Sequence, residues 1–232
     1  LGILCGLLVI ILLYYVFDNK KNYMLSKEII ILAVIILLTF SMSGIVYTAV
    51  GILVLFLFQV FKNKECIPRR MLMYFLFGIC LLIIILSTNN PISNRFFSMF
   101  LGMDGSYNFR WSAAVNVFRK TMEITDYWGM GLGNMNTPSG LSFLLSIGID
   151  YKFANSFLYF FTENGMLGII YTIYLFLICI YNCIKSSKNI RPLKVGVLAF
   201  AFVSQIAGGY YTDPILWIVY GIVCSNEKTV IN

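Results

Sequence analysis

Long runs of apolar residues, separated by short polar segments, dominate the chain. A helix needs about 20 predominantly apolar residues to cross a bilayer, with a range of about 17–25. The pattern therefore predicts an all-α polytopic membrane protein. The apolar runs cover residues 1–17, 29–61, 71–87, 155–182, 193–207 and 214–225.

The run 29–61 is too long for one crossing and just long enough for two short ones. A small polar break, TFSMSG at residues 39–44, interrupts it near the middle. The segments on either side, 18–28 and 62–70, both carry lysines or arginines, which mark cytoplasmic loops. Because two loops on one side require two crossings between them, residues 41–44 are expected at the outer surface.

The remaining runs then give about seven transmembrane helices, arranged in three regions. Residues 1–87 are expected to hold four crossings, with 29–61 as two short ones. Residues 88–154 form a large outer-face loop or cap, and residues 155–232 hold three crossings and a cytoplasmic tail. Every short basic segment then falls on the same side of the bilayer.

Composition agrees with a membrane protein and limits the chemistry. Apolar residues make up 59% of the chain and charged residues 12%, and the mean hydropathy is +0.84. The net charge of +7 fits basic cytoplasmic loops, and no nucleic-acid partner is expected because no basic patch is interleaved with exposed aromatics. Six cysteines occur without a CxxC pair and histidine is absent, so neither a metal site nor a histidine base is expected. Leu1 already lies in an apolar run, which favours a C-terminal fragment of a longer protein.

The outer region is rich in aromatic residues, so it is expected to fold as a cap with amphipathic helices. Residues 107–123 fit a helix with Arg119 on its polar face. The predicted apolar face consists of Trp111, Ala114, Val115, Val117, Phe118 and Met122. Arg110 falls on the edge of the apolar face. It could snorkel to water, or it could bind an anionic ligand, since the planar guanidinium suits phosphate oxygens. Arg95 leaves the same two options open, an interfacial anchor or a second phosphate contact.

Two further stretches carry unusual residues. WGMGLGN, residues 128–134, predicts a tight turn or a close backbone approach. The apolar run that follows opens with FANSFLYFFTENGMLGII, which places Asn155 and Glu163 near the outer end of a membrane helix. Ionisable groups in such helices usually face a bundle interior or a water-filled cavity, although Glu163 could instead pair with a cation for structure. Gly165 and Gly168 are expected to allow close helix packing.

Three motifs occur here in the order found in the O-antigen ligase and polysaccharide polymerase family. They are LTFSMSG (38–44), FRWSAAVNVFRK with DYWGMGLGN (109–134), and ANSFLYFFTENGMLGII (154–170). With the long outer loop between two membrane helices, they make residues 30–180 resemble that family. The resemblance implies transfer of a glycan from an undecaprenyl-diphosphate carrier to an acceptor sugar hydroxyl, on the outer face of a bacterial plasma membrane. It also implies a metal-independent, inverting glycosyltransferase without a cofactor, whose arginines bind the diphosphate.

Two departures from the family pattern occur, the first at an expected phosphate contact and the second at a position that bears on the acceptor. An arginine often follows the first motif, but here Met42 and Gly44 stand around that position. In ligases a histidine precedes the asparagine of the third motif, and here Ala154 takes its place. This favours a polymerase for O-antigen, capsule or exopolysaccharide over an O-antigen ligase, and it admits a chain-length regulator as a partner besides the lipid-linked oligosaccharide and the bilayer.

The chemistry suggests roles for individual residues. Departure of a lipid diphosphate builds negative charge that a positioned cation stabilises, and Arg110 is the first candidate and Arg95 the second. The acceptor hydroxyl must lose a proton, and without histidine the base is expected to be a carboxylate. The candidates are Glu163, Asp150, Asp104 and Asp126. Trp111, Tyr151, Tyr107 and Trp128 could stack on sugar rings, or they could form an aromatic belt at the membrane interface. Asn155 is expected to line the substrate cavity.

Two other classes of protein remain open. A polysaccharide or lipid transporter would need paired polar interruptions near mid-membrane, often in internal repeats, and no repeat is evident. A membrane scaffold or sensor subunit would not need an arginine on the apolar edge of a helix. The concentration of polar chemistry in the outer region favours a surface enzyme.

Overall fold

The computed structural model describes most of the chain, and every regular element in the described part is helical. The described residues are 2–18, 24–39, 42–62, 76, 78, 80, 83–84, 87–89, 91–101, 109–148, 155–207 and 211–225. The predicted all-α class is confirmed. The helices are α1 (Gly2–Asp18), α2 (Met24–Leu38), α3 (Met42–Lys62), α5 (Pro91–Phe100), the π-helix η1 (Phe109–Ala113), α7 (Ala114–Ile124), the 3₁₀-helix η2 (Asn134–Asn136), α8 (Pro138–Ser146), α9 (Ser156–Lys185), α10 (Arg191–Ala207) and α11 (Pro214–Cys224).

The run 29–61 divides into two helices, as predicted. α2 ends at Leu38 and α3 begins at Met42, so the interruption falls inside the TFSMSG stretch. Thr39 satisfies two carbonyls at the end of α2, since its backbone N–H donates to Ile35 O (3.0 Å) and its hydroxyl donates to Ile36 O (2.7 Å). A short polar break is therefore enough to end one helix and start the next.

Seven membrane crossings are not confirmed by helix length. In the described part of the chain, two helices are long and apolar enough to cross a membrane, through residues 43–60 of α3 and through α9. α1 and α11 are apolar but shorter, with 17 and 11 residues. Most of the crossing expected at 71–87 lies outside the described residues. α3 and α9 favour a membrane protein.

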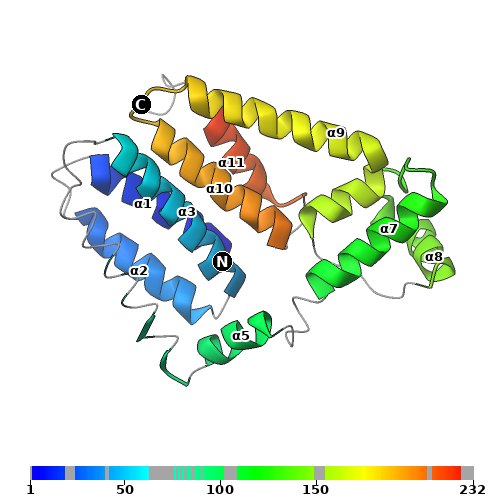
Figure 1. The fold of residues 1–232 in the computed structure, drawn as a ribbon, viewed down its shortest axis with the longest axis horizontal. Coiled ribbons are helices and arrows are strands. Elements are labelled where there is room, and N and C mark those ends of the chain that lie inside the picture. The colour runs from blue at the N-terminus through cyan, green and yellow to red at the C-terminus, as the bar shows by residue number, and fades with distance from the viewer. Residues whose placement is uncertain are drawn as a thin grey trace.

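The long helices form an antiparallel bundle in which α3 packs against α10, α1 packs against α2 and α3, and α9 contacts α10 and α11 (Figure 1). The end of α9, the start of α10 and the end of α11 meet at one end of the bundle. There Lys194 Nζ donates to Ser225 O (2.8 Å) and Arg191 Nη2 donates to Ile184 O (2.6 Å). α3 also ends and α2 also begins at this end (Figure 1). The helix ends next to the basic segments therefore share one end of the bundle.

Glycines allow a close helix contact between α3 and α10. A Cβ on Gly196 would lie 3.0 Å from Leu55 Cβ and 3.1 Å from Gly51 O, so the two backbones approach closely. Small residues allow this kind of approach between apolar helices, where packing rather than water exclusion stabilises the contact. The core beside this contact is fully buried at Leu55, Val197 and Phe200.

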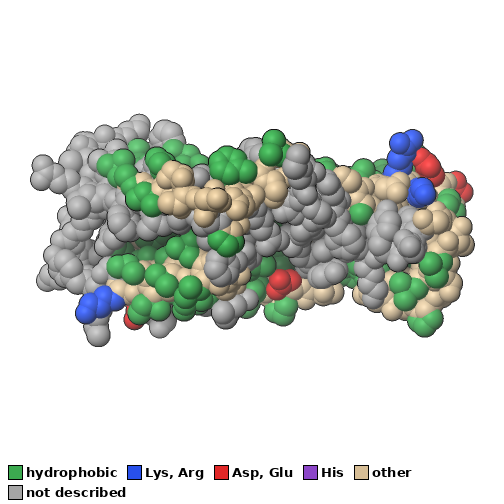
Figure 2. Space-filling model, turned by 90° about the horizontal axis from the view of Figure 1, so that it is seen from below, with side chains coloured by type: hydrophobic (Ala, Val, Ile, Leu, Met, Phe, Trp, Pro, Cys, Tyr) green, Lys and Arg blue, Asp and Glu red, His purple; other side chains and the backbone are tan. Residues whose placement is uncertain are grey.

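The outer region folds, where it is described, into a helical cap beside one end of the bundle, with α7 and α8 at its far side (Figure 1). Lys, Arg, Asp and Glu side chains gather mainly at this end, while the rest of the described face is largely hydrophobic (Figure 2). The cap has its own core, in which Val117 of α7 and Leu144 of α8 pack with Met135 and with Tyr159 of α9.

The buried face of the cap helix differs from the predicted one. Ala114, Val117 and Thr121 are fully buried, whereas Trp111 is 42% exposed and Val115 is also exposed. The helix begins as the π-helix η1, whose wider turn changes the register of the first residues relative to a regular α-helix. The predicted apolar face was therefore wrong at Trp111 and Val115 and correct at Val117.

The α3–α10 contact generates a stability prediction. Gly196→Val should lower the free energy of unfolding by about 1–3 kcal/mol, because the added methyl groups overpack a closed contact. Gly221→Val in α11 is the matched control, since a Cβ there meets nothing within 4 Å. Thermal unfolding of both variants in the same detergent measures the difference, and equal melting temperatures would contradict the packing argument.

Candidate functional site

Glu163, Tyr211 and the glycine-rich turn of the cap meet at a break in α9. Gly165 has φ 57° and ψ −142°, far from helical values, so α9 consists of residues 156–164 and 166–185 joined at a bend. The bend is visible where α9 passes the cap (Figure 1). This differs from the expected role of Gly165, which was close helix packing. Glycine suits the position because an L residue is strained at such backbone angles.

The backbone groups that lose their helical partners at the break form hydrogen bonds with residues 127–131 of the cap, which we call the glycine-rich turn. In an unbroken helix Thr162 O would accept a hydrogen bond from the N–H four residues later. Here Met130 N donates to Thr162 O (3.0 Å) and Gly131 N donates to Glu163 O (2.8 Å). On the other side of the break, Met166 N donates to Tyr127 O (3.0 Å). We call these three hydrogen bonds the clasp.

Two glycines make the clasp possible because their backbones touch. A Cβ on Gly129 would lie 2.6 Å from both Glu163 O and Gly165 N, and a Cβ on Gly165 would collide with Tyr127 O. Both residues also have positive φ. The WGMGLGN stretch therefore provides the close backbone approach that its glycines predict, and its partner is the break in α9.

Glu163 lies at the centre of this contact and is fully buried. Its Oε1 accepts a hydrogen bond from Met135 N (3.1 Å) in η2, and its Oε2 accepts one from the Tyr211 hydroxyl (2.8 Å) in the turn between α10 and α11. Both partners are neutral donors. One carboxylate thus ties α9, the cap and the α10–α11 turn together.

Tyr211 holds its hydroxyl on Glu163 through packing on two aromatic rings. Its ring centroid lies 5.0 Å from that of Phe160 and 5.9 Å from that of Tyr159, and Trp217 Nε1 donates to Tyr211 O (3.0 Å). Burial and the hydrogen bond to Glu163 raise the pKa of Tyr211 well above its usual value. Tyr211 therefore stays protonated and remains a donor at physiological pH.

Asn155 caps α9 and also joins it to α10. Its Oδ1 accepts from Leu158 N (3.1 Å) and its Nδ2 donates to Ile206 O (2.8 Å). The side chain is buried, and both of its polar atoms are engaged within the fold. This geometry gives Asn155 a positioning role at the start of the helix.

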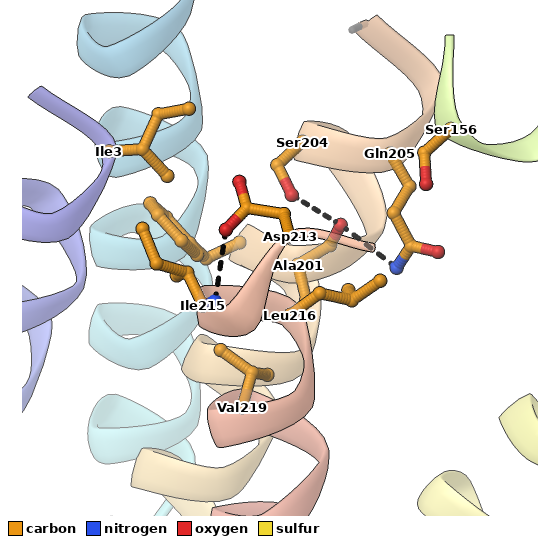
Figure 3. Close-up of a pocket in the computed structure, with 10 residues that line it drawn as sticks. Ile3, Ser156, Ala201, Ser204, Gln205, Asp213, Ile215, Leu216 and Val219 are labelled. Atoms are coloured by element: carbon orange, nitrogen blue, oxygen red, sulfur yellow. Dashed lines mark hydrogen bonds between the residues drawn. The ribbon is translucent and has the colours of Figure 1, made fainter. Parts of the chain in front are cut away.

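A small cavity with a mixed polar and apolar lining lies next to Ser156, between the starts of α9 and α11, α10 and Ile3 of α1 (Figure 3). Gln205 Nε2 donates to Tyr220 OH (2.8 Å), and Asp213 Oδ1 accepts from Ile215 N (3.0 Å) to cap α11. The cavity measures about 20 Å³, room for about one water molecule. It is too small for a sugar ring, so it does not serve as the substrate site.

Arg110 and Trp111 lie in η1, the π-helix that leads into α7. π-Helical turns occur frequently at functional sites. Arg110 lies four residues before the fully buried Ala114, and its own side chain lies outside the described residues. α7 contacts α9, and the Phe118 ring lies 6.3 Å from that of Phe161.

The remaining predicted residues are placed as follows. Arg119 is solvent-exposed as predicted, and its Nε pairs with Glu123 Oε1 (3.0 Å). Arg95 belongs to α5, but its side chain lies outside the described residues, and Asp126 is exposed in the turn after α7 with φ 48°. Three predicted residues lie wholly outside the described part of the chain: Asp104, Asp150 and Tyr151.

The structure thus brings Glu163, Asn155 and the η1–α7 helix around one half of α9. Sequence reasoning missed Tyr211, which is 48 residues from Glu163 along the chain. The available signal was the polar and aromatic composition of GGYYTD, residues 208–213, between two apolar runs. Comparison of the chain with protein-family models, with curated proteins and with solved structures finds no match.

The break in α9 can be tested with Gly165→Ala. We expect the unfolding free energy to fall by more than about 1–2 kcal/mol, the cost of left-handed backbone in an L residue, because the new Cβ also displaces the turn. Gly148→Ala is the control, since Gly148 has φ 76° and open space around its Cβ. Thermal unfolding measures the loss of stability, and limited proteolysis within residues 127–131 detects the displacement of the turn. An equal loss in both variants would show that the contact with the turn contributes nothing.

The Tyr211–Glu163 hydrogen bond can be tested with Tyr211→Phe. Leaving one oxygen of a buried carboxylate without its donor should cost about 1–3 kcal/mol of unfolding free energy. Tyr174→Phe is the control, because Tyr174 is exposed on α9.

The pH dependence of the Tyr211→Phe effect has a defined sign. The pKa of Tyr211 is raised in the folded state, so its stabilisation is fully present below its unfolded pKa of about 10 and declines as the pH rises through the folded value. The stability difference between wild type and Tyr211→Phe should be constant from neutral pH to about pH 10 and shrink above it. A difference that instead changes between pH 6 and 9 would contradict this assignment.

Proposed function

We propose that this chain is the glycan-transferring part of a polysaccharide polymerase. It transfers a glycan from an undecaprenyl-diphosphate carrier to an acceptor sugar hydroxyl, on the outer face of a bacterial plasma membrane, for O-antigen, capsule or exopolysaccharide synthesis. The observation that carries the proposal is the clasp, because it seats the Arg110-bearing helix against one half of a broken apolar helix. The resemblance of residues 30–180 to O-antigen ligases and polymerases supports the same conclusion.

The proposed topology has seven crossings, with the basic helix ends in the cytoplasm and the cap outside. Its support is the bundle itself, since Lys194 and Arg191 lie at the end of α10 that is remote from the cap. Positive charge marks cytoplasmic ends in short-looped membrane proteins. The cap then faces the compartment in which lipid-linked repeat units are joined.

Arg110 is the residue proposed to bind the diphosphate. It lies four residues before Ala114, where the fully buried side of α7 begins, and its own side chain lies outside the described residues. Arg119 of the same helix is exposed and paired with Glu123 on the surface. A guanidinium at a partly desolvated interface stabilises phosphate charge more strongly than one in water.

The reaction follows from the charges involved. The acceptor oxygen attacks the anomeric carbon of the donor, the bond from that carbon to the diphosphate oxygen breaks, and the configuration inverts. The lipid diphosphate leaves with an added negative charge. Arg110 is the first candidate to stabilise this charge, and Arg95 is the second. The acceptor proton passes to a carboxylate.

Glu163 fits a positioning role better than the role of that base. Both of its oxygens already accept hydrogen bonds and its side chain is fully buried, so an acceptor hydroxyl reaches it only if Met135 or Tyr211 moves. We therefore assign the base first to Asp150, which follows α8 in the outer loop. Trp111, exposed in η1, and Tyr151 are proposed to stack on sugar rings.

A transporter is the second candidate, and the break in α9 is the observation that favours it. Discontinuous apolar helices in transporters use freed carbonyls to coordinate ions. In this chain the freed carbonyls of Thr162 and Glu163 accept hydrogen bonds from the cap. Because those acceptors are engaged, the break serves to attach the cap, which favours the enzyme.

The proposal predicts different effects for two arginines of the same helix. In a deletion host that still makes the lipid-linked repeat unit, Arg110→Ala should collapse the surface-glycan ladder to single repeats. Arg119→Ala should keep the ladder, since an exposed ion pair contributes only about 0–1 kcal/mol. Gel analysis of surface glycan at matched protein level provides the measurement.

The outcomes separate the candidate functions. A full ladder in both variants would remove Arg110 from the site. A wild-type protein that gives no ladder even with its native repeat unit, but moves lipid-linked oligosaccharide across the membrane, would favour the transporter.

A further inference from the structure

α9 is longer than the hydrocarbon core of a bilayer. As one straight helix its 30 residues would extend about 45 Å, whereas the hydrocarbon core is about 30 Å thick. The break at Gly165 divides it into a first part, 156–164, and a second part, 166–185, which alone extends about 30 Å. The second part contains no charged residue before Lys185. Its length and composition therefore match the hydrocarbon core without the first part.

The two parts of α9 also differ in what covers them. None of the side chains of residues 156–164, all of which the structure describes, is exposed, because the cap and the bundle pack around them. Exposed apolar side chains begin directly after the break and recur to the end of the helix. Apolar surface of this extent marks a protein or membrane interface, and the matching length selects the membrane. The exposed side chains include Met166, Leu167, Ile170, Tyr174, Leu177 and Ile184.

The first part of α9 lies across the end of the bundle that is next to the cap. At the opposite end, Arg191 Nη2 donates to Ile184 O (2.6 Å), so α10 begins beside the end of α9. At the cap end, Asn155 Nδ2 donates to Ile206 O (2.8 Å), one residue before α10 ends. The first part thus starts at the cap end of α10 and finishes at the cap end of the second part. Figure 1 shows it turning back from the break toward α10.

Aromatic side chains mark both ends of the second part of α9. At the cap end, Trp128 is 73% exposed and Tyr127 is 60% exposed, and the hydrogen bond from Met166 N to Tyr127 O (3.0 Å) fixes their turn to the break. At the other end, Lys185 Nζ lies 5.7 Å from the ring centroid of Tyr181. Tryptophan and tyrosine at head-group depth, with lysine at the cytoplasmic end, are common anchors of membrane helices.

We propose that the glycine-rich turn is an anchor in the head-group region of the bilayer, and that the surface of the hydrocarbon core passes through the break at Gly165. The partner of this surface is the lipid bilayer itself. Leu132, which follows the turn, is also exposed and adds apolar area. Asp126, directly before the turn, is exposed as well, which fits head-group depth and not the hydrocarbon interior. The inference goes beyond the proposed function, because it holds whether or not the chain transfers a glycan.

This placement also sets the depth of Glu163. The residue precedes the break by two positions, about 3 Å along the helix axis. Its carboxylate and the two groups that donate to it therefore lie at the outer surface beside the cap. The discontinuous helices of transporters differ, because their breaks and binding sites lie near the middle of the bilayer.

Tryptophan fluorescence of the full chain in nanodiscs tests the depth of the turn. The chain has three tryptophans, so the first variant keeps Trp128 alone through Trp111→Phe and Trp217→Phe. Two matched variants add Trp128→Phe and place the single tryptophan at another exposed position. These are Tyr174→Trp, near the middle of the second part of α9, and Leu145→Trp, on α8 at the far side of the cap. The quenchers are aqueous iodide and two lipids, with bromine near the carbonyl end or near the methyl end of the acyl chains.

Trp128 should lose more fluorescence to the shallow bromine than to the deep bromine. The Tyr174→Trp variant should show the reverse order, and the Leu145→Trp variant should respond to iodide alone. Deep bromine that quenches Trp128 as strongly as the Tyr174→Trp variant would place the break in the middle of the membrane and overturn the proposal. Trp128 that responds to iodide alone, like the Leu145→Trp variant, would place the turn in water and overturn it as well.

A second measurement uses the unaltered chain, so it does not depend on how the tryptophan variants fold. A phospholipid with a diazirine in its head group should label residues 127–132, and one with a diazirine at the end of its acyl chain should label residues 173–177. Labelling of 127–132 by the chain-end reagent alone would contradict the proposed depth. Absence of labelling there by either lipid, while 173–177 is labelled, would show that the turn does not touch the bilayer.

Discussion

The three hydrogen bonds between the glycine-rich turn and the break in α9 are the constraint on which the candidate site depends. A break inside a long apolar helix leaves carbonyl and N–H groups without partners, and such groups are costly away from water. Here Met130 N and Gly131 N bind the freed carbonyls, and Tyr127 O binds the freed N–H of Met166. The break is therefore stable only while the cap is attached, and the cap is oriented only while the break exists.

Glu163 adds charge chemistry to this backbone contact. A carboxylate that is fully removed from water is tolerated when its oxygens accept hydrogen bonds, and here one donor comes from η2 and the other from Tyr211. The two donors belong to segments far apart in sequence, so the carboxylate fixes the cap relative to the α10–α11 turn. Gly129 contributes at the same place, because any side chain there would separate the turn from Glu163 O.

The sequence predicts those features that depend on local chemistry. The division of 29–61 into two helices, the close backbone approach at WGMGLGN and the exposed Arg119 all follow from neighbouring residues, and the structure agrees with each. The break at Gly165 was not predicted, since a glycine in an apolar helix usually serves packing. Its cause is the turn that occupies the place of a Cβ, which is a tertiary contact. Tyr211 was missed for the same reason, and the exposure of Trp111 reflects a π-helical turn that a regular helical period does not represent.

The break in α9 positions both the polar contact of Glu163 and an apolar groove between the two parts of α9 and α10, whose lining includes Phe157, Phe161 and Ile173. The two features therefore depend on the same bend, although they lie on different faces of the helix. The direction of residues 156–164 relative to 166–185 decides how far Phe157 and Phe161 lie from Ile173, and it also decides whether Glu163 meets Met135 N and Tyr211. A change at Gly165 alters both sides together. A change at Tyr211 affects only the polar side, because Tyr211 packs on the Tyr159–Glu163 face and does not line the groove. One bent helix thus places a polar contact with the cap on one face and an apolar groove on another face of the same short segment.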